Sequence, residues 1–229
     1  MCGRYTLKAS PEVLQEVFDI AEMPAGWRAR YNVAPTQAAP IIANRGDGPG
    51  QRVVEAFRWG LVPAWAKDPA IGSRLINARA ETADSKPSFR AALQRRRCLV
   101  LTDGFYEWQK AGRERIPTWI HGPDERPFAM AGLWERWRQE DGAVLHSFTI
   151  LTTAANEAMV PIHHRMPVIL APETWPRWLD PEPAPADLLR ALLAQDLAPS
   201  LSTRIVGQRV NSPRHDDPEC LELPRGGLL

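Results

Sequence analysis

Short hydrophobic segments follow one another through the middle of this 229-residue chain, and few of them are separated by a helix. Each has the length of a β-strand, and glycine or proline marks turns between them, as at 46–50 and 122–123. The predicted strands span residues 40–43, 52–59, 98–102, 105–108, 118–121, 128–134, 145–152 and 168–170. Because consecutive strands without intervening helices pair antiparallel, the sequence predicts an α+β fold around a curled, barrel-like, mainly antiparallel sheet.

Three segments have the hydrophobic periodicity of short amphipathic helices. They are "SPEVLQEVFDI" (10–20), "KPSFRAALQRRR" (86–97) and "PADLLRALLAQ" (185–195). Ser10 is suited to cap the first of them, with Pro11 in its first turn. No internal repeat or long linker divides the chain, so we expect a single domain over residues 1–229, with a weakly ordered tail at 210–229.

The charge of the chain is balanced, with 28 Lys and Arg against 27 Asp and Glu, so no global field points to a polyanionic partner. The segment 71–100 differs, because it carries seven cations against two acids and can form one basic face. The three cysteines, Cys2, Cys98 and Cys220, form no CxxC motif and cannot all pair with one another, which favours free thiols. With no signal peptide and no apolar run long enough to cross a membrane, we expect a cytoplasmic protein.

Cys2 directly follows the initiator methionine, which methionine aminopeptidases remove before residues as small as cysteine. The mature chain would then begin with an α-amine and a thiol on one residue. An α-amine has a pKa of roughly 7.7–8.0, against about 10.4 for lysine, so more of it is neutral at cellular pH. A neutral amine condenses with an aldehyde to a Schiff base, and the neighbouring thiol can close that imine to a thiazolidine. The alternatives are the nucleophile of an N-terminal amidohydrolase and an incidental cysteine.

Two further motifs contain groups suited to proton transfer. In "DGFYEW", Glu107 lies between Tyr106 and Trp108 on a predicted strand, where packing among aromatic rings would raise its pKa toward that of a proton donor. An ordinary outward-facing acid is the alternative. In "PIHHRMP", His163 and His164 are expected to point in different directions, so they are poor ligands for one metal, but one could be a general base. An exposed histidine loop is the alternative, and we expect no metal or other cofactor.

"RWGLVPAWAK" and "INARAET" contain residues suited to contacts with nucleic acid. Trp65 is a candidate for stacking on a base, a contact worth about 1–3 kcal/mol, and the alternative is a core tryptophan. Asn77 and Arg79 share a face if their segment is extended. Arg79 and Lys86 belong to the basic segment and could follow a phosphate backbone. A solvated cationic surface is the alternative for both.

Eight motifs occur in a fixed order: "MCGRY", "YNVAPTQ", "RWGLVPAW", "INARAET", "RCLVLTDGFYEW", "FAMAGLWE", "LTTAAN" and "IHHRMP". Together they resemble the SOS response-associated peptidase (SRAP) family, also called abasic site processing proteins. The resemblance extends from Cys2 to about Trp178. It implies a protein that binds single-stranded DNA, crosslinks covalently to abasic sites and shields them from strand cleavage. It also implies an autopeptidase activity that exposes Cys2. We expect a monomer with no membrane partner, associated with the nucleoid when it is bound to DNA.

The resemblance also implies a role for each site residue. Cys2 would form the thiazolidine with the aldehyde of the ring-opened sugar. Glu107 would move protons during Schiff-base formation, His163 would assist ring opening and reversal, and Asn77 would position the sugar and the amine. The residues expected to contact flanking phosphates or a base are Arg4, Trp65, Arg79, Lys86 and Arg165.

Two other functions remain open from the sequence. One is an N-terminal-nucleophile cysteine peptidase or amidase, acting on itself or on peptides, in which Glu107 or His163 activates the Cys2 thiol. The other is a binding module for single-stranded DNA in which the cysteine has no role.

Overall fold

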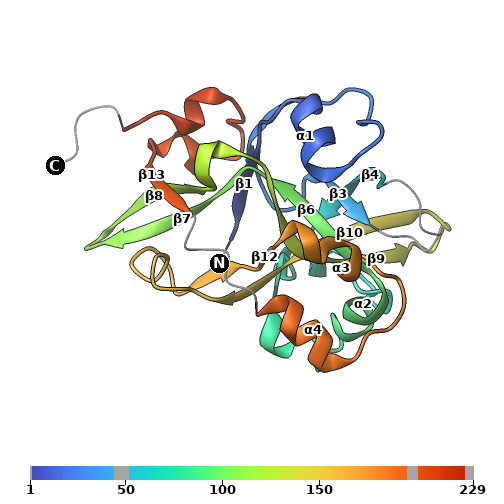
Figure 1. The fold of residues 1–229 in the computed structure, drawn as a ribbon. Coiled ribbons are helices and arrows are strands. Elements are labelled where there is room, and N and C mark those ends of the chain that lie inside the picture. The colour runs from blue at the N-terminus through green and yellow to red at the C-terminus, as the bar shows by residue number, and fades with distance from the viewer. Residues whose placement is uncertain (1, 44–51, 195–200, 225–229) are drawn as a thin grey trace.

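The fold is built on two β-sheets, with short helices packed around them (Figure 1). The computed structural model describes residues 2–43, 52–194 and 201–224. The strands are β1 (Arg4–Leu7), β2 (Arg30–Val33), β3 (Ala38–Ala43), β4 (Val54–Trp59), β5 (Asn77–Arg79), β6 (Arg97–Thr102), β7 (Gly104–Ala111), β8 (Glu114–His121), β9 (Phe128–Arg138), β10 (Val144–Ala154), β11 (Arg165–Pro167), β12 (Ile169–Leu170) and β13 (Ser202–Ile205). The helices are α1 (Pro11–Phe18), α2 (Arg90–Arg95), α3 (Trp175–Trp178) and α4 (Ala186–Leu193), with 3₁₀ helices η1 (Pro69–Arg74), η2 (Ala80–Thr82), η3 (Pro123–Glu125), η4 (Pro172–Thr174), η6 (Gln208–Asn211) and η7 (Pro218–Leu221).

Five strands close into a barrel. β10 pairs with β4, β4 with β3, β3 with β6, β6 with β9, and β9 returns to β10. The β10–β4 pair is parallel, with Phe148 opposite Trp59, and the other four pairs are antiparallel. β10 also pairs with β5 in parallel and with β11 antiparallel. The α+β class and the curled sheet are therefore confirmed, while β10 adds parallel pairing to a mainly antiparallel structure.

Side chains alternate between the two surfaces of the barrel strands. On β6, Cys98 and Val100 belong to a buried cluster with residues of β3, β4 and β10, whereas Leu99 and Leu101 pack with residues of the helices. Gly132 of β9 faces the first cluster, and a Cβ there would lie 2.7 Å from the Cys98 Sγ atom and 2.8 Å from Val100 Cγ2. The barrel core is filled so tightly at this point that it leaves no room for a side chain.

The helices cover the outer side of the barrel. α1 begins after Ser10, whose side chain accepts a hydrogen bond from the Val13 backbone N–H, and it buries Leu14, as its sequence predicts. α2 is shorter at both ends than the predicted segment 86–97, because residues before Arg90 form turns. α4 lies within the third predicted segment, whose residue 195 is outside the described residues.

The second sheet has the order β13–β8–β7–β1–β2 and carries the C-terminal residues 201–224 (Figure 1). The Asp216 carboxylate accepts hydrogen bonds from the backbone N–H groups of Tyr31, at 2.6 Å, and Asn32, at 2.9 Å. The Asn32 side-chain amide in turn donates to the carbonyls of Val210, Ser212 and His215. The described part of the tail is therefore ordered, unlike the weak order expected from residue 210, because hydrogen bonds to β2 hold it. Residues 225–229 lie outside the described residues.

All eight predicted strands are present, with ends that differ by a few residues. The sequence did not predict β1, β2, β5, β11 and β13, which have three or four residues each and contain polar residues or proline.

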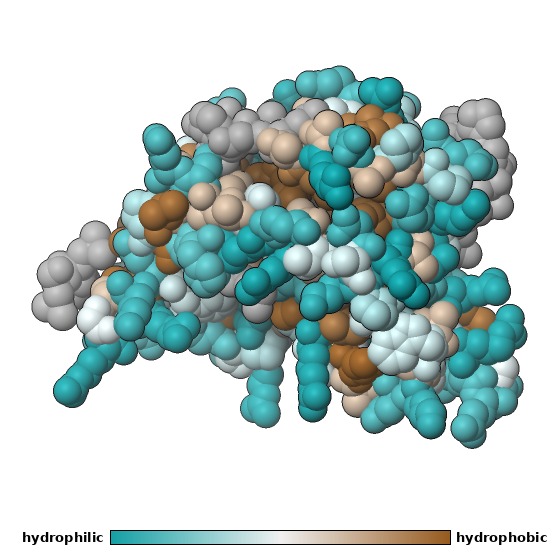
Figure 2. Space-filling model, turned by 90° about the horizontal axis from the view of Figure 1, so that it is seen from below, coloured by the Kyte–Doolittle hydropathy of each residue, from teal (hydrophilic) through white to brown (hydrophobic). Residues whose placement is uncertain are grey.

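On the face seen from below, hydrophobic residues form separate patches between hydrophilic side chains (Figure 2). Within the described residues, no helix combines the length and the apolar composition that a membrane crossing requires.

Candidate functional site

Cys2 lies two residues before the start of β1 and is fully buried. β1 pairs on one side with β2 and on the other with β7, so the residues that precede it are enclosed by the second sheet. The Cys2 Sγ atom lies 3.8 Å from the Arg4 carbonyl oxygen. Burial raises the pKa of the Cys2 thiol well above its usual range, and the nearby Glu107 carboxylate raises it further. Both effects favour the neutral thiol over the thiolate.

Asn77 contacts Cys2 directly. Its side-chain amide donates a hydrogen bond to the Cys2 carbonyl at 2.8 Å, across 75 residues of sequence. The position of Asn77 is set by β5, which pairs with β10 so that Asn77 lies opposite Ile150. The Asn77 Oδ1 atom is buried and accepts no hydrogen bond from any described residue. An unsatisfied buried acceptor costs about 1–3 kcal/mol and is uncommon in a folded core, so this oxygen could accept a hydrogen bond from a group that the structure does not contain.

Glu107 lies on β7, one residue beyond the pairing of Tyr106 with Arg4, and its side chain is almost completely buried. Burial raises the pKa of its carboxyl group, the direction that the sequence predicts. Desolvation by burial is the main cause. The two aromatic neighbours, Tyr106 and Trp108, pack in a cluster with the C-terminal segment, and Trp108 also lines a pocket together with Glu107.

His163 and His164 are stacked, with ring centroids 4.3 Å apart and an angle of 29° between the planes. The expectation that they point in different directions is therefore wrong. Hydrogen bonds from the Ile162 and His163 backbone N–H groups to the Met159 carbonyl, each of 2.9 Å, tighten the loop before β11, in which the two histidines lie. Burial is the main cause that lowers the pKa of His163, while the charge of His163 is the main cause that lowers the pKa of exposed His164. Both rings are thus biased toward the neutral form, and His163 is the one that faces the site.

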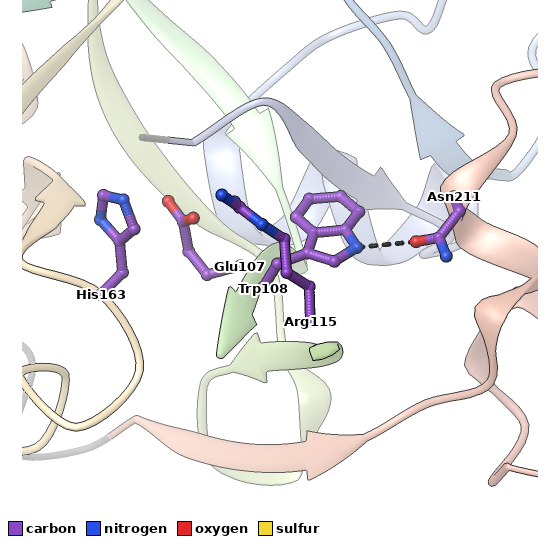
Figure 3. Close-up of a pocket in the computed structure, with 5 residues that line it drawn as sticks. All are labelled: Glu107, Trp108, Arg115, His163 and Asn211. Carbon is purple, nitrogen blue, oxygen red and sulfur yellow. Dashed lines mark hydrogen bonds between the residues drawn. The ribbon is translucent and has the colours of Figure 1, made fainter. Parts of the chain in front are cut away.

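A pocket of about 350 Å³ opens beside these groups (Figure 3). It is lined by Glu107, Trp108, Arg115, His163 and Asn211. The Glu107 carboxylate lies between the His163 ring and the Arg115 guanidinium, and the Trp108 indole donates a hydrogen bond of 2.7 Å to the Asn211 side-chain oxygen. The structure therefore brings together Cys2, Asn77, Glu107 and His163, four predicted catalytic residues drawn from distant parts of the chain.

The sequence did not identify Trp108, Arg115 or Asn211 as site residues. Gly112 at the tip of "KAGRER" is a signal for a hairpin, and a hairpin register would have placed Arg115 on the same face as Trp108. Asn211 could not be found this way, because its position depends on the long-range packing of the C-terminal segment.

Two of the predicted DNA-binding arginines make extensive contacts within the protein. The Arg4 guanidinium donates to Asn32 Oδ1 at 3.0 Å and to the Val210 carbonyl at 2.7 Å. The Arg165 guanidinium forms a bidentate ion pair with Glu81, at 2.6 and 2.9 Å, and this pair lowers the pKa of the Glu81 carboxyl group. Their predicted role on phosphates therefore requires that these contacts leave donors available or open when DNA binds.

The other three predicted DNA-binding residues are exposed. Arg79 ends β5 and Lys86 lies in a turn before α2, and the side chain of neither makes a hydrogen bond or ion pair with another described residue. The Trp65 side chain is 60% exposed. Its loop is held by a hydrogen bond of 2.7 Å from the Trp137 indole to the Ala66 carbonyl. None of the three lines the pocket.

Comparisons with known proteins show the family and the fold of this chain. The family model for SOS response associated peptidase (SRAP) matches residues 1–213. The chain is 43% identical over 225 residues to the abasic site processing protein YoqW of Bacillus subtilis, covering 97% of this chain and 99% of that protein. It is 35% identical over 224 residues to the abasic site processing protein HMCES of Gallus gallus, covering 85% of this chain and 66% of that protein. A crystal structure of a protein from Bacteroides thetaiotaomicron superimposes with a TM-score of 0.83 at 28% identity, covering 97% of this chain and 99% of the other.

Proposed function

Because this chain belongs to the SOS response-associated peptidase (SRAP) family, we propose that it processes abasic sites by binding single-stranded DNA and capturing the lesion covalently through Cys2. The names of its relatives from Bacillus subtilis and Gallus gallus support the class of lesion. The protein acts as a monomer in the cytoplasm, on the nucleoid when DNA is bound. Removal of Met1, by the chain itself or by an aminopeptidase, exposes the Cys2 amine.

The proposed reaction joins Cys2 to the open-chain sugar in two steps. The Cys2 amine attacks the C1′ aldehyde, and the carbinolamine loses water to give a Schiff base. The Cys2 sulfur then bonds to the same carbon, and the thiol proton passes to the imine nitrogen, which closes a thiazolidine ring. One water molecule leaves overall, so the reaction needs no oxidant and no cofactor.

Proton transfer in both steps is assigned to Glu107. Burial raises its pKa, so its carboxyl group keeps a proton at a higher pH than an ordinary glutamate and can protonate the departing hydroxyl. The carboxylate that remains is next to the Cys2 thiol and can accept its proton during ring closure. His163, biased toward its neutral form, accepts the C1′ hydroxyl proton when the sugar ring opens and returns it on reversal.

The observation that carries the proposal is the contact between Asn77 and Cys2. The amide nitrogen of Asn77 fixes the Cys2 carbonyl, while its buried Oδ1 atom has no partner among the described residues. A hydrogen of the free amine would satisfy that acceptor and orient the nitrogen lone pair toward the aldehyde. Arg4, Arg79, Lys86 and Arg165 supply the phosphate contacts, and exposed Trp65 supplies a stacking surface.

A cysteine peptidase of the N-terminal-nucleophile type is the second candidate, and the family name favours it. Such an enzyme uses the thiolate as its nucleophile. Burial and the Glu107 charge raise the pKa of the Cys2 thiol, which suppresses the thiolate. Thiazolidine closure tolerates a neutral thiol better, because its proton can leave as the carbon–sulfur bond forms.

The experiment is to mix the mature protein with single-stranded DNA that carries one abasic site. The native chain should form an adduct that survives denaturing electrophoresis, and Cys2→Ala should form none. Glu107→Ala and His163→Ala should slow adduct formation or reversal by about 10²–10⁴ fold while DNA binding persists. Turnover of a peptide substrate that is lost in Cys2→Ser and indifferent to DNA would favour the peptidase instead.

A further inference from the structure

The outer part of the β7–β8 hairpin carries an aromatic residue and two cations on one face. In the antiparallel register Trp108 lies opposite Pro117 and Lys110 lies opposite Arg115, and residues two apart on a strand share a face. Trp108, Lys110 and Arg115 therefore form a single surface, which we call the hairpin face. The hairpin extends away from the barrel at the edge of the molecule (Figure 1).

Lys110 and Arg115, the two cations of the hairpin face, lie directly opposite each other, and neither forms an ion pair with a described acid. Like charges directly across an antiparallel pair are destabilising. Lys110 and Arg115 are exposed, and neither forms a hydrogen bond or ion pair with any other residue that the structure describes. The Arg4 and Arg165 side chains, in contrast, donate several hydrogen bonds to acceptors within the protein. The hairpin face thus carries two positive charges that are not paired with a described residue and are available to bind an anion.

Part of the hairpin face lines the pocket that contains Glu107 and His163. Arg115 and Trp108 line the pocket together with Glu107 and His163 (Figure 3). The Trp108 indole is fixed by its hydrogen bond to Asn211, so one wall of the pocket is a rigid aromatic ring. Arg115 and His163 line the same pocket, and the positive charge of Arg115 is one of the causes that lower the pKa of His163.

We propose that the hairpin face is a second DNA-binding surface, on which Arg115 and Lys110 bind the phosphates that continue the strand from the abasic nucleotide. The inference rests on the proposed function. Arg115 is placed to hold a phosphate adjoining the captured sugar, because it lines the same pocket as Glu107 and His163. Lys110, farther along the hairpin, is placed for the next phosphate. Trp108 closes the pocket between the sugar and these phosphates, a combination of aromatic and cationic groups typical of single-strand binding.

The binding test uses single-stranded DNA that carries a tetrahydrofuran abasic analogue, which has no aldehyde and cannot crosslink. Arg115→Gln should weaken binding roughly threefold to tenfold at low salt and reduce the salt slope by about 0.7, the value for one lost phosphate contact. Lys110→Gln should change binding in the same direction. Arg113→Gln is the matched control, because it removes the same charge from the hairpin turn and Arg113 does not line the pocket.

A second experiment tests which phosphate Arg115 contacts. Each phosphate next to the analogue is replaced in turn by a neutral methylphosphonate. The effect of Arg115→Gln should largely disappear with one of these substitutions and persist with the others, whereas Arg113→Gln should show no such coupling. Equal losses in Arg115→Gln and Arg113→Gln, or the absence of coupling at every position, would overturn the inference.

The two proposals fail separately. If the native chain does not crosslink to a true abasic site, the proposed function is wrong, and the binding arms still decide whether the hairpin face contacts DNA. If the native chain crosslinks and Arg115→Gln binds as well as Arg113→Gln does, only the hairpin face is rejected.

Discussion

The Asn77 side-chain amide donates a 2.8 Å hydrogen bond to the Cys2 carbonyl, and the oxygen at the other end of the same amide is buried without a partner among the described residues. One side chain thus holds Cys2 by its carbonyl while keeping an acceptor beside it. β5 and the start of β1 meet in this way because β5 is fixed to β10, a strand of the barrel.

This arrangement predicts the effect of Asn77→Ala. The variant should bind single-stranded DNA as the native chain does but form the Cys2 adduct up to about 10²-fold more slowly, because the amine is no longer oriented. The measurement is the rate of adduct formation at saturating DNA. Ser73→Ala, at an exposed position of η1, is a matched control that should leave the rate unchanged. A native rate for Asn77→Ala would remove its positioning role.

The buried Glu107 predicts a pH dependence of stability. Its pKa is raised in the folded state by desolvation, so the folded chain keeps a proton that the unfolded chain has lost above the ordinary value of about 4.5. The free energy of unfolding should therefore fall as the pH rises above that value. In Glu107→Gln this part of the decline should be absent.

Urea unfolding of both chains over a pH series measures the difference. Glu114→Gln, which changes an exposed acid on the same hairpin, is the control and should follow the native curve. Parallel curves for the native chain and Glu107→Gln would show that the folded carboxyl group is not perturbed.

The Arg165–Glu81 ion pair predicts that the Glu81 carboxylate lowers the affinity of the protein for single-stranded DNA. Glu81→Gln should tighten the binding of single-stranded DNA by roughly twofold to fivefold at low salt, because the phosphate no longer competes with a carboxylate for the guanidinium. The gain should shrink as salt is added. Asp84→Asn removes an equal charge from a nearby acid that pairs with Arg190 instead, and it should have a smaller effect. Weaker binding by Glu81→Gln would mean that the pair serves to orient Arg165.

Asp216 predicts the stability of the C-terminal segment. Its carboxylate accepts two backbone hydrogen bonds from β2 and pairs with Arg30, so Asp216→Ala should lower the free energy of unfolding by about 2–4 kcal/mol. Limited proteolysis should then cut the chain within residues 207–224. Asp187→Ala, at an exposed position of α4, should change neither measurement. Unchanged proteolysis of Asp216→Ala would indicate that other contacts hold the segment.

Much of the fold could be predicted from the sequence, because long strands such as β9 bury a nearly continuous run of hydrophobic residues. The short strands could not. β5 is three residues long, and its pairing depends on Ile150, which lies far along the chain. The order of the C-terminal segment depends on Asn32 and Asp216, two polar residues whose contacts appear only after folding.

In the candidate site, too, some features could be predicted from the sequence and others depend on contacts between distant residues. The chemistry of Cys2 is visible in its position and type, and the direction of the Glu107 pKa could be predicted from its surroundings. The partners of Arg165 could not, since Glu81 is 84 residues away and appears in the sequence only as one acid within a basic segment. Arg115 is an intermediate case, because the face on which it lies follows from the register of the β7–β8 hairpin, which only Gly112 signals in the sequence.

The measurement that tests the central claim most directly is the intact mass of the protein before and after incubation with abasic single-stranded DNA. The account predicts that the adduct contains the chain without Met1 plus the DNA, less one water molecule, and that Cys2→Ala gives no such mass. An adduct formed by chains that still carry Met1, or formed equally by Cys2→Ala, would contradict it.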